Sequence, residues 1–567
     1  MNNPRTLLFM AWLLVLFLLW QAWDSHHRIQ DLPSAPPAVD APPVPADVPA
    51  AVDVPAPHTD LPAVDVPPAV APELTPAVAE TVSEDTIEVR TDVLRLDISL
   101  TGGAIVVADL LDYPVAPRTP DQPVRLLNSE PQRLFVARVG IADLERGGPT
   151  HLARFSSSRR SYALREGDEE LIVTLNWEDA ARHIEVQRTY TFRRGSYQIV
   201  HRDVVRNRGG EAWVGRPYRD LERTPPVRPS GWSFTNPEMY SFVGAGWWSP
   251  QDKFSKKTLD DFSKANLGLD IEGGWGALLQ HYFVAAWIPD ARQSVRYETS
   301  VPTAGRYRLR LVDPGFRVEP GAEAAVEARL FIGPKLQNLL PEVATGLDLT
   351  VDYGIFTIFA KPLFWLLNWI HGLVGNWGLA IVLLTVLIKL AFFKLTEAQF
   401  RSMAKMRKVQ PRLMALKERY GDDRQKMNQA MMELYKKEKI NPLGGCLPIL
   451  VQIPIFIALY WVLLESVELR QAPFFGWIQD LSAPDPYFIL PVLNGLAMWA
   501  TQKLSPAPGM DPMQQKIMQT LPLVFAVLFA FFQAGLVLYW TVNGVLSLAQ
   551  QWYITRKIDM QGTQDKR

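Results

Sequence analysis

The feature that most constrains this chain is a run of 38 uncharged residues at 517–554. As a single α-helix the run would be about 57 Å long, nearly twice the roughly 30 Å of hydrocarbon in a bilayer. Lysines precede the run and Arg556 and Lys557 follow it, and positive residues favour the cytoplasmic side of a membrane. We therefore expect the run to cross a membrane twice, with a turn at residues 533–535 and both flanks in the cytoplasm.

Four shorter apolar segments extend this pattern, at residues 6–23, 375–395, 443–464 and 487–502. Residues 396–440 carry 12 Lys or Arg against 6 Asp or Glu, which predicts a cytoplasmic segment. The 16 residues of 487–502 are short for a span, so local thinning of the bilayer or an extension to Pro484 is required. The arrangement predicts six spans with both termini in the cytoplasm.

The N-terminal segment 6–23 fits either a membrane anchor or a signal peptide. Bulky residues follow it where a cleavage site needs small ones, so an uncleaved anchor is favoured. Residues 33–76 then contain 14 prolines among 44 residues and no Lys or Arg. Proline-rich chains extend as polyproline II, so we expect a tether outside the membrane rather than a Pro-rich binding motif.

Between residues 86 and 333, apolar residues repeatedly alternate with polar ones, as in 171–177. This period of two predicts β-strands, and a region of this length suits a two-sheet antiparallel sandwich. Its histidines are scattered without metal-ligand spacing, so no metal site is expected. The single cysteine, Cys446, excludes an intrachain disulfide. Paired carboxylates for sugar chemistry remain open, because such pairs need not be close in sequence.

The expected fold is an α+β membrane protein, with an all-β sandwich outside the membrane, an α-helical core of five spans and one N-terminal anchor helix. The predicted boundaries are 1–25 for the anchor, 26–85 for the linker, 86–345 for the β domain, 346–374 for an interfacial amphipathic helix, 375–554 for the core with a helical hairpin at 396–440, and 555–567 for a cytoplasmic tail. The formal net charge of −1 gives no support for nucleic-acid binding through a basic surface.

Lys389 is the only charged residue in 375–393, and the last five predicted spans contain no Asp or Glu. An ionisable residue inside a membrane costs about 2.5 to 3.5 kcal/mol and points to a function. Thr385 lies one helical turn before Lys389. Other spans also carry polar residues, namely Gln452, Asn494, Gln502, Thr541, Asn543 and Gln550. Together they predict a shared wet cavity, although a lysine that extends to the headgroups and polar contacts between helices are alternatives.

The segment 396–440 is amphipathic and predicts two helices, the second capped by the aspartates at 422–423. It holds six of the chain's 14 methionines. Flexible thioethers suit a surface that accepts many apolar partners, although packing within the hairpin explains them equally well. The candidate client contacts are Met403, Met406, Met427 and Met431.

Five motifs in the C-terminal half are specific enough to indicate a family. They are SMAKMRKVQP (402–411), NPLGGCLPILVQIPIFIALY (441–460), VELRQAPF (467–474), DPMQQK (511–516) and GLVLYW (535–540). In this order they closely resemble the YidC membrane protein insertases of Gram-negative bacteria, within the YidC/Oxa/Alb family. The resemblance implies an inner-membrane protein with a periplasmic super-β-sandwich and a five-helix core. In the family this core encloses a hydrophilic groove that opens to the cytoplasm and to lipid and is closed toward the periplasm.

The resemblance also implies roles for individual residues. Lys389 stands where family members usually carry the arginine of the groove. The family implies groove-lining positions at Thr385, Gln452, Tyr539 and Trp540, to which the polar pattern adds Asn543. Arginine keeps its charge in almost any surroundings, whereas a desolvated lysine can release its proton, so the exchange bears on the mechanism. The turn at 533–535 departs as well, with Gln-Ala where a Pro-Ser pair is common.

These features predict an insertase and chaperone that inserts newly made inner-membrane proteins and helps them fold, not an enzyme. No Gly-x-x-x-x-Gly-Lys-Ser/Thr loop occurs, so neither nucleotide hydrolysis nor a cofactor is expected. Candidate partners are nascent membrane proteins, the lipid bilayer, the ribosome and the Sec translocon, without recognition of a nucleic-acid sequence. The alternatives are a small-solute transporter, which would need inverted repeats that the uneven spans lack, and a membrane-anchored carbohydrate-active protein.

Overall fold

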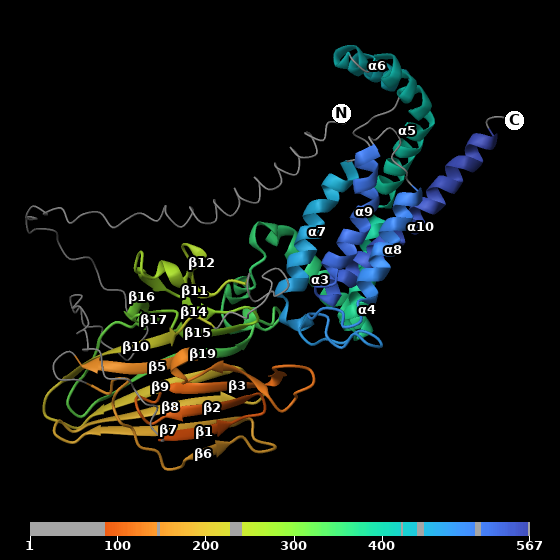
Figure 1. The fold of residues 1–567 in the computed structure, drawn as a ribbon. Coiled ribbons are helices and arrows are strands. Elements are labelled where there is room, and N and C mark those ends of the chain that lie inside the picture. Colours follow the sequence, from red (N-terminus) through yellow and green to blue (C-terminus); the bar gives the residue numbers. More distant parts are fainter. Residues whose placement is uncertain are drawn as a thin grey trace, which may run out of the picture. The chain divides into compact units, whose positions relative to one another are not determined.

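The computed structural model describes residues 85–143, 148–226, 241–420, 423–438, 447–504 and 512–564. The predicted anchor and linker lie outside these residues. Strands fill the N-terminal part of the described chain and helices the C-terminal part (Figure 1). This division agrees with the predicted all-β domain followed by an α-helical core.

The strands form two sheets in which almost all neighbours are antiparallel. The larger sheet follows the order β13 (Gly268–Glu272), β16 (Ser294–Thr303), β17 (Arg306–Val312), β10 (Trp213–Arg223), β5 (Phe135–Asp143), β3 (Ile105–Pro114), β2 (Leu94–Ser99), β1 (Thr86–Arg90) and β6 (Ser161–Ala163), with β18 (Phe316–Val318) paired to β10 and β4 (Pro123–Leu127) paired to β3. The second sheet follows the order β12 (Lys253–Thr258), β11 (Gly244–Ser249), β14 (Trp275–Leu279), β15 (Phe283–Pro289), β19 (Glu323–Pro334), β9 (Gln198–Asn207), β8 (Ile184–Arg193) and β7 (Glu170–Asp179).

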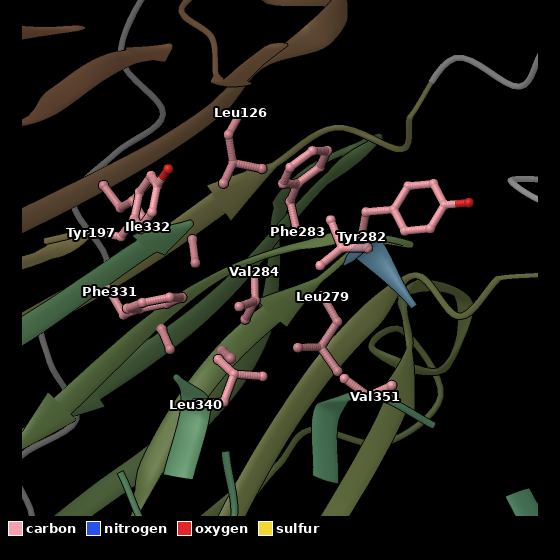
Figure 2. Packing of buried hydrophobic residues seen from close by; sticks show 14 of the residues in the cluster. Leu126, Tyr197, Leu279, Tyr282, Phe283, Val284, Phe331, Ile332, Leu340 and Val351 are labelled. Atoms are coloured by element: carbon pink, nitrogen blue, oxygen red, sulfur yellow. The ribbon is translucent and has the colours of Figure 1, made fainter. Parts of the chain in front are cut away.

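The core of the β domain follows from the predicted alternation, because every second residue of a strand faces the same side. β14 and β15 differ, since every residue in them is buried. Figure 2 shows Leu279 and Val284 of these strands in one apolar cluster with Leu340 and Val351, which come after the last strand. The core therefore continues into the chain segment that leads to the helices.

The inward face of β8 also carries a charge. Arg188 is fully buried, and its Nε and Nη2 atoms each donate to a carboxylate oxygen of Asp203 on β9 at 2.8 Å. Burial alone would raise the pKa of Asp203, but the neighbouring Arg188 and His201 outweigh this effect and lower it. A second buried carboxylate, Asp220, accepts two bonds of 2.7 Å from Arg310. These charges are therefore paired inside the fold, as buried charges must be.

Helices make up the C-terminal part of the described chain. They are α2 (Leu340–Val343), α3 (Thr357–Val374), α4 (Trp377–Ala391), α5 (Phe393–Tyr420), α6 (Arg424–Lys437), α7 (Leu447–Glu465), α8 (Ile489–Leu504), α9 (Pro512–Phe529) and α10 (Ala534–Gln564). α10 packs against both α4 and α8, and α7 packs against α3. The break in the long apolar run lies between Phe529, where α9 ends, and Ala534, where α10 begins, so it precedes most of the turn predicted at 533–535.

A helix that crosses a membrane must be both long enough and apolar enough. Within the described ranges, no single helix meets both criteria for a membrane span, whereas the bent pair Trp377–Ala391 and Phe393–Ser402 meets them together with an angle of 61° between its halves.

α3 has two different apolar faces. Ala360, Phe364, Leu367 and Ile370 recur at helical spacing and are buried. The opposite face exposes large apolar side chains, with Ile358 at 75% and Trp365 at 67%. Asp348 pairs with Lys361 at 2.8 Å near the start of the helix. The helix occupies only 357–374 of the amphipathic helix predicted for 346–374, because two short 3-10 turns precede it, and its position at a membrane surface stays a prediction.

Charged residues are also buried where the β domain meets the segment after α7, and we call this group the junction cluster. It consists of His281, Lys335, Gln337, Glu465 and Glu468. His281 Nε2 lies 3.0 Å from the carbonyl oxygen of Leu464, and the Gln337 amide donates to Glu468 Oε1 at 2.9 Å. Burial raises the pKa of Glu468 to about 7 and lowers that of His281 to about 3. The cluster therefore favours neutral side chains at these two positions.

Candidate functional site

Lys389 lies on α4, a helix whose other residues are almost all apolar. The start of this helix is fixed by Asn376, whose Oδ1 accepts from the Leu379 amide at 2.9 Å and whose Nδ2 donates to the Phe474 carbonyl at 3.2 Å. Position 378 requires glycine, because a Cβ there would lie only 2.2 Å from the Phe474 ring. The loop after α7 thus fixes where α4 begins, and Lys389 lies twelve residues after that start.

The ammonium of Lys389 is held inside the helical core. Lys389 is only 8% exposed, and its Nζ donates to Ser547 Oγ on α10 at 2.7 Å. The Ser547 hydroxyl in turn donates to the carbonyl of Asn543, one helical turn earlier, at 2.7 Å. In the described part of the chain, no carboxylate lies within ion-pair distance of Lys389. The charge is therefore bound by a neutral partner.

Two other predicted residues join this group through α7. Gln452 Nε2 lies 3.5 Å from Asn543 Oδ1, a long hydrogen bond, and the Gln452 side chain also interacts with the Tyr539 hydroxyl. Tyr539 itself is almost fully buried. We use the name Lys389 cluster for Lys389, Ser547, Asn543, Gln452 and Tyr539, which join α4, α7 and α10.

Thr385 and Trp540 are used differently. Thr385 is buried on α4, but its hydroxyl donates to the Ile381 carbonyl of its own helix at 2.7 Å. The Trp540 ring stacks on Phe456 with centroids 5.5 Å apart and lies 3.9 Å from the Phe529 ring. Trp540 therefore belongs to an aromatic group that joins α7, α9 and α10, beside the polar cluster rather than in it.

The remaining polar residues of the spans lie elsewhere on α8 and α10. The Thr541 hydroxyl donates to carbonyls of Leu490 and Val537, at 3.2 and 2.8 Å. Asn494 is 3% exposed, and its Nδ2 has no hydrogen-bond partner among the described residues. Thr541 and Asn494 therefore lie between α8 and α10. The Lys389 cluster uses a different face of α10, so these predicted polar residues do not share one site with it.

Sequence reasoning missed Ser547. A signal was present, because Tyr539, Asn543 and Ser547 recur every four residues and so share one face of α10. A lone serine near the end of an apolar run is common as a helix-joining residue, and only the docking of α10 against α4 distinguishes it.

The methionine candidates are only partly described. Met427 and Met431 lie one turn apart on the half-buried face of α6, whereas the side chains of Met403 and Met406 lie outside the described part. Asp423 caps α6 as predicted, since its Oδ1 accepts from the Gln425 and Lys426 amides at 3.2 and 3.1 Å.

Across the residues that the structure describes, no three His, Cys, Asp or Glu side chains are grouped so that they could hold a metal ion.

The chain combines a large antiparallel β domain with apolar helices that surround the Lys389 ammonium. This combination is typical of membrane-associated proteins that have an extramembrane domain and a polar site among their helices. Comparison with known proteins narrows this class. Residues 86–366 match the model of the YidC periplasmic domain, and residues 369–561 match that of the 60Kd inner membrane protein.

Two relatives are similar along their whole length. The membrane protein insertase YidC of Thioalkalivibrio sulfidiphilus is 49% identical, over 99% of this chain and 100% of the relative. That of Nitrosococcus oceani is 48% identical with the same coverage. A crystal structure of an active YidC insertase with its first transmembrane domain resolved is 19% identical, covers 83% of this chain and 93% of its own, and gives a TM-score of 0.38. The chain belongs to the YidC family of membrane protein insertases.

Proposed function

We propose that this insertase accepts the polar tail of a client protein beside Lys389, in a hydrophilic groove between α4, α7 and α10. The observation that carries the proposal is the geometry of Lys389, a buried ammonium bound to a neutral hydroxyl at 2.7 Å. Such a cation keeps most of its capacity to attract a carboxylate. An acidic client tail can therefore be held partway across the bilayer while the apolar helix of the client moves sideways into lipid.

The energetics of this step need no nucleotide. A client helix of about 20 apolar residues gains on the order of 6 to 12 kcal/mol on entering the bilayer. The membrane potential contributes about 2.3 kcal/mol per charge for each 100 mV and favours outward movement of an acidic tail. These gains exceed the cost of moving one or two polar groups across a shortened hydrocarbon path.

The finer topology belongs to the same proposal. Six spans hold both termini in the cytoplasm, the β domain is periplasmic, and the exposed apolar face of α3 lies in the outer membrane surface. The α5–α6 hairpin then faces the cytoplasm, where Met403, Met406, Met427 and Met431 meet apolar client segments. The ribosome and the Sec translocon are candidate partners on the two routes by which clients arrive.

The test compares clients with acidic and neutral tails in liposomes that contain the purified protein. Lys389→Ala should slow insertion of the acidic-tailed client, Lys389→Arg should preserve it, and Lys389→Glu should slow it most. The neutral-tailed client is the internal control, because it has no carboxylate to attract. Equal insertion of both clients by the alanine variant at matched protein levels contradicts the electrostatic role.

The carbohydrate-active alternative gains no support from the described residues. The buried carboxylates Asp203 and Asp220 are each bound by an arginine, so they stabilise the β domain and do not form a free acid–base pair.

A further inference from the structure

The hydroxyl of Ser547 is oriented by its own helix. Its proton is directed to the Asn543 carbonyl at 2.7 Å, an i−4 bond within α10. A hydroxyl has one proton and two acceptor lone pairs, so its lone pairs remain for other donors. One of them receives the Lys389 ammonium at 2.7 Å, from a residue 158 positions earlier in the chain. Ser547 is thus a fixed acceptor, not a freely rotating one.

A lysine needs such an acceptor more than an arginine does. Its ammonium is a compact charge on a flexible four-carbon stem, whereas a guanidinium is planar and presents five donors in a rigid fork. Lys389 also lies only two residues before the end of α4 at Ala391, and α5 begins at Phe393 after a bend of 61°. A side chain so close to a helix end can extend toward headgroups unless something holds it.

We infer that Ser547 is a positioning residue that holds the Lys389 ammonium inside the helical core, on the α10 side of α4. The inference rests on the proposed role of Lys389 toward acidic client tails. One donor of the ammonium is used by Ser547, and the other two remain for a carboxylate and water. Asn543 and Gln452 continue the polar path from this point toward α7.

The first experiment measures where the ammonium lies. The full chain is reconstituted with its cytoplasmic side outward and exposed to a membrane-impermeant amine reagent, and mass spectrometry follows the peptide that contains Lys389. Ser547→Ala should raise the labelling rate of Lys389 by about tenfold, the factor expected when one charge-assisted hydrogen bond is lost. Ser547→Thr should keep the wild-type rate, because its hydroxyl can make the same i−4 bond.

Two further variants keep this measurement decisive. Ser547→Cys preserves volume but offers only a weak acceptor, so it should change labelling in the same direction as alanine. Thr541→Val removes a hydroxyl from the α8 side of the same helix and should leave Lys389 labelling unchanged. Equal labelling in wild type, Ser547→Ala and Ser547→Cys overturns the inference.

The second experiment separates this inference from the proposed function. Ser547→Ala should slow insertion of the acidic-tailed client severalfold while sparing the neutral-tailed client, and in a Lys389→Arg background the same change should have little effect. Faster labelling without any change in insertion would support the positioning role and contradict the electrostatic role of Lys389. Slower insertion by Lys389→Ala together with unchanged labelling in Ser547→Ala would support the electrostatic role of Lys389 and contradict the positioning role of Ser547.

Discussion

Replacing Glu468 with glutamine should make the junction cluster more stable, by an amount that grows as pH rises from about 4.5 and is complete above about 7. Glu468 lies on η8 (Val467–Leu469), directly after α7. Its Oε1 accepts from the Gln337 amide at 2.9 Å, while its buried Oε2 has no hydrogen-bond partner among the described residues. Glutamine keeps the acceptor that Gln337 uses and removes the charge that burial disfavours.

The sign and size of the effect follow from the pKa. Burial raises the pKa of Glu468 from 4.5 in the unfolded chain to about 7. A raised pKa means that the protonated form is favoured in the fold, so this stability is fully present below pH 4.5 and is lost as pH rises through about 7. The full difference corresponds to about 3 kcal/mol, and the half-buried position of the side chain as a whole reduces this to about 1 to 3 kcal/mol.

The neighbouring groups do not obscure this window. Tyr113 and Tyr353 are coupled to Glu468, but burial raises the pKa of each above its usual value, so both keep their protons up to pH 9. His281, whose pKa burial lowers to about 3, is present in both proteins, so its contribution is the same in each. Lys335 and Glu465 are present in both proteins, so their contributions to the free energy of unfolding cancel in the comparison.

The assay is thermal unfolding of the full chain in lipid nanodiscs from pH 4 to pH 9. Wild type and Glu468→Gln should unfold at nearly the same temperature at pH 4, below the unfolded pKa of 4.5, and the variant should be several degrees more stable at pH 8.5. The conversion is about 2 to 4 °C per kcal/mol for a domain of this size. Glu342→Gln, at an exposed position on α2, is the control and should have no effect. A difference that does not depend on pH, or a less stable Glu468→Gln protein at pH 8.5, refutes the reasoning.

Two other predictions concern the division of labour in the chain. Deletion of residues 86–329 should leave insertion largely intact, because the Lys389 cluster is built only from α4, α7 and α10, and loss of insertion by a stably expressed deletion protein would contradict this. Serine at Met403, Met406, Met427 and Met431 should weaken photocrosslinking to nascent clients without unfolding α5 and α6, whereas unchanged crosslinking would show that the methionines only pack the hairpin.

Local patterns made part of the fold predictable. The alternation in 171–177 depends only on the pleat of one strand, and β7 spans it. The gap between α9 and α10 followed from an apolar run too long for one span, and the cap at Asp423 from the preference of aspartate for the free amides of a helix start. Each of these signals lies within one continuous stretch of the chain, so the sequence alone contains it.

Pairings across the chain were not predictable in the same way. The order of the sheets places β10 between β5 and β17, an arrangement that no local periodicity reveals. Ser547 meets Lys389 only because α10 docks on α4, and Glu468 meets the Gln337 backbone amide across 131 positions of the chain. The same limit explains Trp540, whose neighbours on α7 and α9 draw it into an aromatic group.

Buried charges are held in two ways in this chain, and the contrast bears on function. In the β domain Arg188 and Arg310 are each matched by an aspartate, which offsets much of the cost of removing both charges from water. Lys389, like Lys257 with its bond to the Ala265 carbonyl, is 8% exposed, and the partner that the described residues give it is the neutral Ser547 hydroxyl. A permanent carboxylate beside it would be the cheaper way to stabilise a resting protein, but it would also occupy the charge. The described residues place no acid beside this cation, and no Asp or Glu occurs in the last five predicted spans, which is the arrangement that the proposed transient binding of an acidic client tail requires.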